Sequence, residues 1–229
     1  MAARKRMRAL GKLLLVLLIV SLVRALLFQT YSVELNSMQP TLAVGDRVVS
    51  FPLPVGAVTI FGKLPRLTTI ERGELLIVNP DAFPTESAWF LAWDSLARFF
   101  TLQYYSPMGS RYGNDAVAPG VYRVIGLPGD TIRRKAALYE IRPAGASAFS
   151  SEFALAKDSY SLSGIVSDSL SSTVNGSSRE LNLGADQYFV ACDDRSVLAG
   201  SALWGPVGSG RIVGRVVAVC WPPSRLKIP

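Results

Sequence analysis

The sequence contains no histidine and only two cysteines among its 229 residues. Zinc sites in proteins are built mainly from these two residue types, so this composition excludes the usual zinc centres, and we expect neither a metal nor another cofactor. Cys192 and Cys220 stand near the ends of apolar runs. If this part of the chain is exported, a disulfide between them is permitted. Spacing does not establish bridge geometry, so two buried free thiols are the simpler prediction.

Acidic residues are also missing from the beginning of the chain, where the first one is Glu34. Five basic residues precede position 13, namely Arg4, Lys5, Arg6, Arg8 and Lys12. The net charge of +7 could indicate nucleic-acid binding, but no basic-aromatic motif accompanies it, and we expect no nucleic-acid partner. A basic stretch before an apolar segment is typical of the cytoplasmic side of a membrane span. We therefore interpret residues 1–12 as a basic cytoplasmic tail.

The segment 13–28 is apolar apart from Ser21 and Arg24. Sixteen helical residues span roughly 24 Å, somewhat less than the ~30 Å hydrocarbon core, and Lys12 and Arg24 are long enough to snorkel to the two headgroup layers. A cleaved signal peptide is the alternative, but the following Gln29-Thr30-Tyr31 offers no small-x-small cleavage site. We predict an uncut single-pass anchor in contact with the lipid bilayer, with the main domain on the extracytoplasmic side.

Beyond the anchor, glycine, proline and short Val/Ile/Tyr runs predict a mainly β, mainly antiparallel domain. The expected strands are 47–51, 74–78, 121–125, a strand from 131, 138–141, 187–192 and 211–220. Residues 52–72 are punctuated by glycine and proline and predict a hairpin or a wandering loop. Residues 144–184 are rich in serine, alanine and glycine and indicate an inserted subdomain or a loosely ordered excursion. The β core then comprises 29–143 and 185–229.

Aromatic residues recur at helical spacing between Glu86 and Thr101, with Trp89 and Trp93 one turn apart. Two interpretations stay open for this segment. The first is a helix packed on the domain core. The second is an interfacial helix with its tryptophans at the level of the lipid headgroups, beside the anchor.

A set of short motifs follows the anchor in a fixed order. They are Ser37-Met38-x-Pro40-Thr41-Leu42, Gly45-Asp46-Arg47-Val48-Val49, Arg72-Gly73-Glu74-Leu75-Leu76, Arg123-Val124-Ile125-Gly126-Leu127-Pro128-Gly129-Asp130, Tyr188-Phe189-Val190 with Asp193-x-Arg195, Trp204-Gly205 and Val213-Gly214-Arg215. In this order they resemble bacterial type I signal peptidases, the membrane-bound serine endopeptidases that remove signal peptides from exported proteins. The resemblance covers most of the chain, except for roughly residues 52–70, 80–118 and 144–184. It implies a β-rich catalytic core with an inserted β subdomain, in the bacterial inner membrane.

The resemblance makes Ser37 the nucleophile that attacks the scissile carbonyl of a signal peptide. In that family a lysine directly before the Arg-x-x-Gly-Leu-Pro-Gly-Asp motif takes the serine's proton, and here this position holds Tyr122. Burial produces the neutral amine of a lysine, which is its basic form, but it disfavours the charged phenolate of a tyrosine. A relocated lysine, from Lys63, Lys135, Lys157 or Lys227, and a base at Asp193 or Asp194 are the alternatives.

The last motif departs from the family pattern as well. Leu198 and Gly200 stand where the family has the serine and the aspartate that orient the lysine. Five other positions match residues that line the family's pockets for small side chains near the cleavage point: Val33, Leu35, Met38, Leu42 and Val121. Met38 and Leu42 can equally be plain core residues.

Two functions remain open from the sequence. The first is a signal peptidase that uses Ser37 with an unconventional base on exported preproteins. The second is a catalytically inactive paralogue that binds signal peptides, or an active signal peptidase, at the membrane. Tyr122, Leu198 and Gly200 favour the second on chemical grounds.

Overall fold

A computed structural model describes residues 6, 11–12, 15–16, 27–56, 58–59, 62–79, 86–87, 89–90, 93–94, 97, 101, 105–112, 119–135, 137–164 and 180–229. Most of the predicted tail 1–12 and anchor 13–28 lie outside the described residues, and both remain predictions. Within the described part of the chain, no helix combines the length and the apolar character needed to cross a bilayer.

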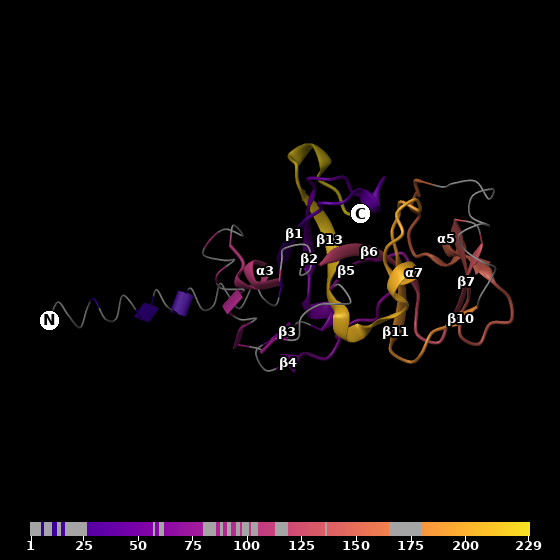
Figure 1. Cartoon of the computed structure of the whole chain (residues 1–229), viewed down its shortest axis with the longest axis horizontal. Coiled ribbons are helices and arrows are strands. Elements are labelled where there is room, and N and C mark those ends of the chain that lie inside the picture. The colour runs from indigo at the N-terminus through magenta and orange to yellow at the C-terminus, as the bar shows by residue number, and fades with distance from the viewer. Residues whose placement is uncertain are drawn as a thin grey trace.

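Seven strands form the main sheet, in the order β1-β2-β13-β5-β6-β11-β12 (Figure 1). Their bounds are Gln29–Ser32 (β1), Arg47–Phe51 (β2), Leu75–Val78 (β5), Gly120–Gly126 (β6), Gln187–Ala191 (β11), Val207–Gly208 (β12) and Ile212–Trp221 (β13). All neighbouring strands in this sheet pair antiparallel. The predicted antiparallel, mainly β architecture is confirmed, and the long strands end within one residue of their predicted limits.

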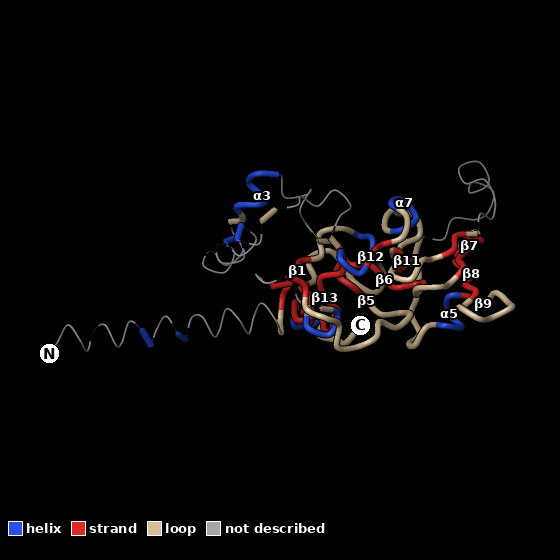
Figure 2. The backbone as a smooth tube through the Cα atoms, turned by 90° about the horizontal axis from the view of Figure 1, so that it is seen from below, coloured by secondary structure: helices blue, strands red, loops and turns tan. Residues whose placement is uncertain are grey.

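A second sheet of four strands has the order β10-β7-β8-β9. It consists of Thr131–Lys135 (β7), Leu138–Arg142 (β8), Ser150–Ser151 (β9) and Leu181–Asn182 (β10), with the short helix α5 at Glu152–Leu155. Two of its strands come from before position 144, where the predicted insert begins. Residues 165–179 of that predicted insert lie outside the described residues. Figures 1 and 2 place β7 and α5 at one end of the molecule and helix α3 (Pro107–Tyr112) on the side of the β domain that is nearer the N-terminus.

The remaining described elements are short. Val58–Thr59 (β3) pairs with Gly62–Lys63 (β4), so the stretch predicted as a hairpin or loop does contain a hairpin. Helix α7 covers Ser201–Trp204. Four single-turn 3-10 helices complete the set: Asn36–Met38 (η1), Leu53–Val55 (η2), Ser209–Arg211 (η3) and Pro223–Arg225 (η4).

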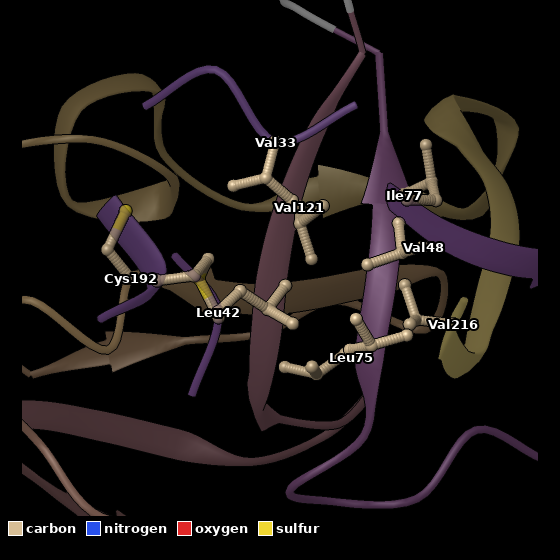
Figure 3. Packing of buried hydrophobic residues seen from close by; sticks show 10 residues of the cluster. Val33, Leu42, Val48, Leu75, Ile77, Val121, Cys192 and Val216 are labelled. Carbon is tan, nitrogen blue, oxygen red and sulfur yellow. The ribbon is translucent and has the colours of Figure 1, made fainter. Parts of the chain in front are cut away.

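The main sheet carries an apolar cluster on each side, because successive residues of a strand point to opposite faces. Leu75 and Ile77 of β5 belong to one cluster, while Leu76 and Val78 belong to the other. Figure 3 shows the first cluster, in which Val33, Leu42 and Cys192 meet the strands of the sheet. This cluster supports the loop that carries Ser37.

The Gly-Leu-Pro-Gly-Asp turn after β6 is held by a buried ion pair. Asp130 is almost fully buried, and the Arg72 guanidinium donates to both of its carboxylate oxygens, at 2.8 and 2.7 Å from one nitrogen. The same carboxylate accepts the backbone N–H of Leu127 at 2.8 Å. Buried charges are tolerated when they are paired and hydrogen-bonded. The ion pair therefore joins two motifs that lie far apart in the sequence, the one that begins at Arg72 and the one that ends at Asp130.

Candidate active site

Ser37 lies in the 3-10 turn η1, on the loop that joins β1 to β2. Met38 and Leu42 anchor this loop, because both side chains are completely buried and the Leu42 N–H donates to the Met38 carbonyl at 2.8 Å. On the other side, the backbone N–H of Asp194 donates to the Ser37 carbonyl at 3.0 Å. The half-buried Ser37 is therefore fixed at the surface of the apolar cluster.

A buried hydrogen-bonded network supports the same loop from β6. Arg123 is 4% exposed, and its Nε and Nη2 donate to the two carboxylate oxygens of Asp193 at 2.7 and 2.6 Å. Its Nη2 also donates to the Thr41 hydroxyl at 3.0 Å, and the Thr41 hydroxyl donates to Asp193. Such a fork of parallel hydrogen bonds fixes geometry as well as charge. The network joins the Ser37 loop, β6 and the last motif.

Tyr122 precedes Arg123 on β6 and packs against both apolar clusters of the sheet. Its ring meets Trp204 edge to face, with centroids 5.2 Å apart, and folds back over Gly120. A Cβ at position 120 would lie 2.6 Å from a ring carbon, so glycine is what permits this ring position. Burial, with a smaller contribution from Cys192, raises the pKa of Tyr122 to about 12. At pH 7 roughly one phenol in 100,000 is then ionised, so Tyr122 is a very poor general base.

The polar group beside the Ser37 hydroxyl is the thiol of Cys192, which hydrogen-bonds with it. Cys192 follows β11 and belongs to the same buried cluster as Met38 and Val121. Burial raises the pKa of the Cys192 thiol to about 11, although the bond to Ser37 acts in the opposite direction. A thiol with this pKa is protonated at neutral pH and does not accept the serine proton. Both cysteines are free, as predicted, but only Cys192 is buried, since Cys220 is half-buried.

Lysines elsewhere in the described chain have other partners. Lys135 pairs with Glu140 at 3.4 Å, and Lys157 pairs with Glu71 at 2.5 Å. The Lys227 ammonium donates to the Thr41 carbonyl at 2.5 Å, and it lines a cavity of about 520 Å³ that also includes Arg123 but not Ser37. Lys63 lies in β4, in a part of the chain whose side chains fall outside the description. Among the described residues, no hydrogen bond joins Ser37 to an amine or to Tyr122.

The two other positions that depart from the family motif, 198 and 200, carry no polar side chain. The Leu198 side chain is mostly exposed. Gly200 has a φ of +73°, and a Cβ there would lie 2.7 Å from the Val190 carbonyl oxygen and 3.3 Å from the ring of Tyr122. An aspartate at this position would therefore be strained by the backbone as well as crowded by its neighbours.

The five residues predicted to line the substrate pockets divide into two groups. Val33, Met38, Leu42 and Val121 are buried together in the first apolar cluster. Leu35, in contrast, is 70% exposed directly before η1. Four of the five residues thus belong to the buried apolar cluster, called the floor of the site below, on which the Ser37 loop packs, and the fifth lies at the surface. Their contact with a substrate stays a prediction.

Two features of the site were missed by the sequence reasoning. The sequence indicated Cys192 only as a core thiol or a disulfide partner of Cys220, although it stands directly before the Asp193 of the last motif. Ser163, from the predicted insert, braces the Ser37 loop by donating its hydroxyl to the Gln39 carbonyl at 2.8 Å. It also forms an isolated parallel bridge with Asp194. Nothing in its serine-rich surroundings distinguishes Ser163 in the sequence.

The segment around Ser163 is tied down by a second buried ion pair. Glu152 of α5 pairs with Arg195, and both side chains are almost fully buried. The Tyr160 hydroxyl donates to the same carboxylate at 2.8 Å, and its ring stacks over the Arg123 guanidinium, whose central carbon is 4.2 Å from the centroid. Burial and the Glu152 charge raise the pKa of Tyr160 well above its ordinary value. The insert and the core therefore share one polar network.

The described residues form an antiparallel β domain that presents Ser37 on a rigid turn above an apolar cluster. A family model described as "Signal peptidase, peptidase S26" matches residues 6–221. The chain therefore belongs to the signal peptidase family. No curated protein matches it.

Proposed function

We propose that this protein binds the signal peptides of exported preproteins in a signal-peptidase type of groove, and that it hydrolyses them extremely slowly or not at all. The observation that carries the proposal is the chemistry around Ser37. The side chain bonded to its hydroxyl is the Cys192 thiol, the motif position of the base holds Tyr122, and burial raises the pKa of both groups far above neutrality. A serine without a base keeps only the weak catalysis that binding and backbone N–H groups supply.

Binding is supported by the parts of the site that do not need a base. The Ser37 loop is fixed by Met38, Leu42 and the Thr41 hydrogen bonds, and the floor below it remains apolar. Family membership implies signal peptides as the ligand class. A signal peptide offers small side chains near its cleavage point, which suit shallow apolar pockets.

The location that fits this function is the bacterial cytoplasmic membrane. We propose that residues 13–28 anchor the chain there once, with residues 1–12 in the cytoplasm and the β domain outside. The support is the apolar segment and the five basic residues before it, together with the membrane association general in this family. The finer assignment rests on sequence alone.

The full chain, purified in detergent, should cleave a preprotein no faster than its Ser37→Ala variant. It should nevertheless bind a fluorescent signal peptide, measured by anisotropy. A matched peptide with bulky residues in place of the small ones near the cleavage point should bind at least about tenfold more weakly, since the tightly packed apolar residues below Ser37 cannot make room for larger side chains without strain. Clear Ser37-dependent processing would refute the inactive interpretation. Equal binding of the two peptides would refute the proposed recognition.

The second candidate is slow but genuine peptidase activity. The specific observation in its favour is that Ser37 is retained on a rigid turn, with its hydroxyl hydrogen-bonded to a side chain. The comparison of the wild type with Ser37→Ala separates the two candidates.

A further inference from the structure

We propose that the helical segment around Trp89 and Trp93 is a membrane-interface surface that docks on the lipid bilayer. The proposal concerns a different part of the chain from the Ser37 site, and it does not depend on whether Ser37 is catalytic. Trp89 is 79% exposed and Trp93 is 60% exposed. Both residues are helical, and their four-residue spacing places them on the same side of a helix.

The other side of this segment is fixed by specific contacts. Asp94 is buried and accepts hydrogen bonds from the Ser106 hydroxyl at 2.6 Å and from the Met108 N–H at 2.9 Å. Met108 of α3 is itself buried. Arg111 of α3 pairs with Glu86 at 3.2 Å and lies over the ring of Phe90, 5.7 Å from its centroid. Since the inner side is held against α3, the two tryptophans are directed outward.

The register of the main sheet shows where this helical segment leaves the domain. Its two ends follow Val78 of β5 and precede Gly120 of β6, and these two residues pair with each other. Val78 also pairs with Ile212, the first residue of β13. Three residues further along β13, Arg215 pairs with Phe51, the last residue of β2. The chain therefore leaves β5 and enters β6 at the end of the sheet where β2 finishes and β13 begins.

The predicted anchor joins the domain at that same end. Gln29, the first residue of β1, pairs with Ser50 near the end of β2. The residue before it, Phe28, is half exposed and stacks on Phe51 with ring centroids 5.6 Å apart. In both views α3 lies on the side of the molecule away from α5 (Figures 1 and 2). A bilayer that holds residues 13–28 would thus face the exposed tryptophans.

The chemistry of tryptophan favours the bilayer as the occupant of this surface. Its indole combines a large apolar body with one N–H donor, and it concentrates at the headgroup layer of membranes for this reason. Two such rings exposed to water on one helical face are costly for a purely soluble surface. Trp221 provides an internal contrast. It is 55% exposed but pairs with Arg47 at the opposite end of β2, roughly 13 Å along the strand from Phe51.

The test uses the full chain reconstituted into phosphatidylcholine vesicles whose acyl chains carry bromine near the headgroup or near the bilayer centre. Bromine quenches tryptophan fluorescence at short range. We expect marked quenching that is stronger with the bromine near the headgroup. The Trp89→Phe/Trp93→Phe variant should lose at least about half of the quenchable intensity. The matched Trp221→Phe variant should lose none of it.

Equal quenching of wild type and Trp89→Phe/Trp93→Phe would overturn the proposal, and so would quenching that disappears in Trp221→Phe. Far-UV circular dichroism checks that each variant is folded. Alkaline carbonate extraction reports on the anchor separately, so a failed anchor is distinguished from an undocked helix. If the tryptophans are unquenched and sedimentation shows that the chain self-associates through them, the occupant is a second copy and the bilayer assignment is wrong.

Discussion

Tyr122 and Arg123 are consecutive residues of β6, yet their surroundings differ completely. Arg123 has a carboxylate, a hydroxyl and a backbone carbonyl to receive its N–H groups, and its whole network matches the family motifs. Tyr122 sits among Gly120, Gly200 and Trp204, and the cation that acts on its phenol, Arg211, lowers the pKa of Tyr122 by less than burial raises it. The half of the site that supports the loop is therefore intact, while the half where the family resemblance places the base is replaced.

The largest expected effect comes from breaking the intact half. Arg123→Met leaves the Asp193 carboxylate buried without its cation and should destabilise the protein by about 3–5 kcal/mol in urea unfolding. The double variant Arg123→Met/Asp193→Leu should recover part of this loss, because no unpaired charge remains. The control is Arg133→Met, at a pair whose side chains are 35% and 21% exposed, with an expected cost below about 1 kcal/mol. Equal losses at positions 123 and 133 would show that the network is not essential.

High pH should have a medium effect on the free energy of unfolding, through two buried groups of the replaced half. In the unfolded chain Cys192 and Tyr122 are hydrated, and their pKa values are the ordinary ones of ~8.5 and ~10. In the folded protein the pKa of Cys192 is about 11 and that of Tyr122 is about 12. Because the folded values are raised, the stabilisation is complete below the unfolded values and is lost as the pH rises through this window. Stability should fall between pH 9 and 12.

The variants Cys192→Ala and Tyr122→Phe should each reduce this loss of stability between pH 9 and 12 by about 1–3 kcal/mol, measured by urea unfolding at several pH values. Cys192→Ala should act mainly in the lower part of the window and Tyr122→Phe in the upper part. Some pH dependence should remain, since burial also raises the pKa of Tyr139. A fall that is unchanged in both variants would contradict the assigned burial of the two groups.

The smallest effect is expected from returning a lysine to the replaced half. Tyr122→Lys alone should give no preprotein cleavage above that of Tyr122→Lys/Ser37→Ala. The new amine would lack the residues that orient it, since Leu198 points to solvent and Gly200 has no side chain. Cys192 also occupies the position beside the Ser37 hydroxyl. Robust cleavage by the single variant would show that the departure of the last motif matters little.

The strands were predictable because their signals are local. Alternating Val and Ile runs bounded by glycine and proline placed β2, β5, β6, β11 and β13 to within a residue. The nucleophile candidate and the substituted base position were also visible, since each lies inside a short motif. The contact between Cys192 and Ser37 was not, because it joins residues 155 positions apart through the packing of η1 on the end of β11.

The role of the insert illustrates the same limit. Its serine-rich composition carries weak periodicity, so Ser163 and Glu152 could not be distinguished from surface residues. Only the fold places Ser163 against the Gln39 carbonyl and Glu152 against Arg195. The ambiguity of the aromatic segment has a similar origin, because helical spacing defines a face without saying what covers it.

The sequence by itself determined the strands, the position of Ser37 and the absence of a lysine at position 122, because each is a property of neighbouring residues. Tertiary structure decided which groups surround the serine, how deeply they are buried and therefore how strongly their pKa values rise. It also decided which end of the sheet carries the exposed tryptophans. The physical reason is that solvation and proton affinity depend on what packs around a group, and that packing brings together residues from distant parts of the chain.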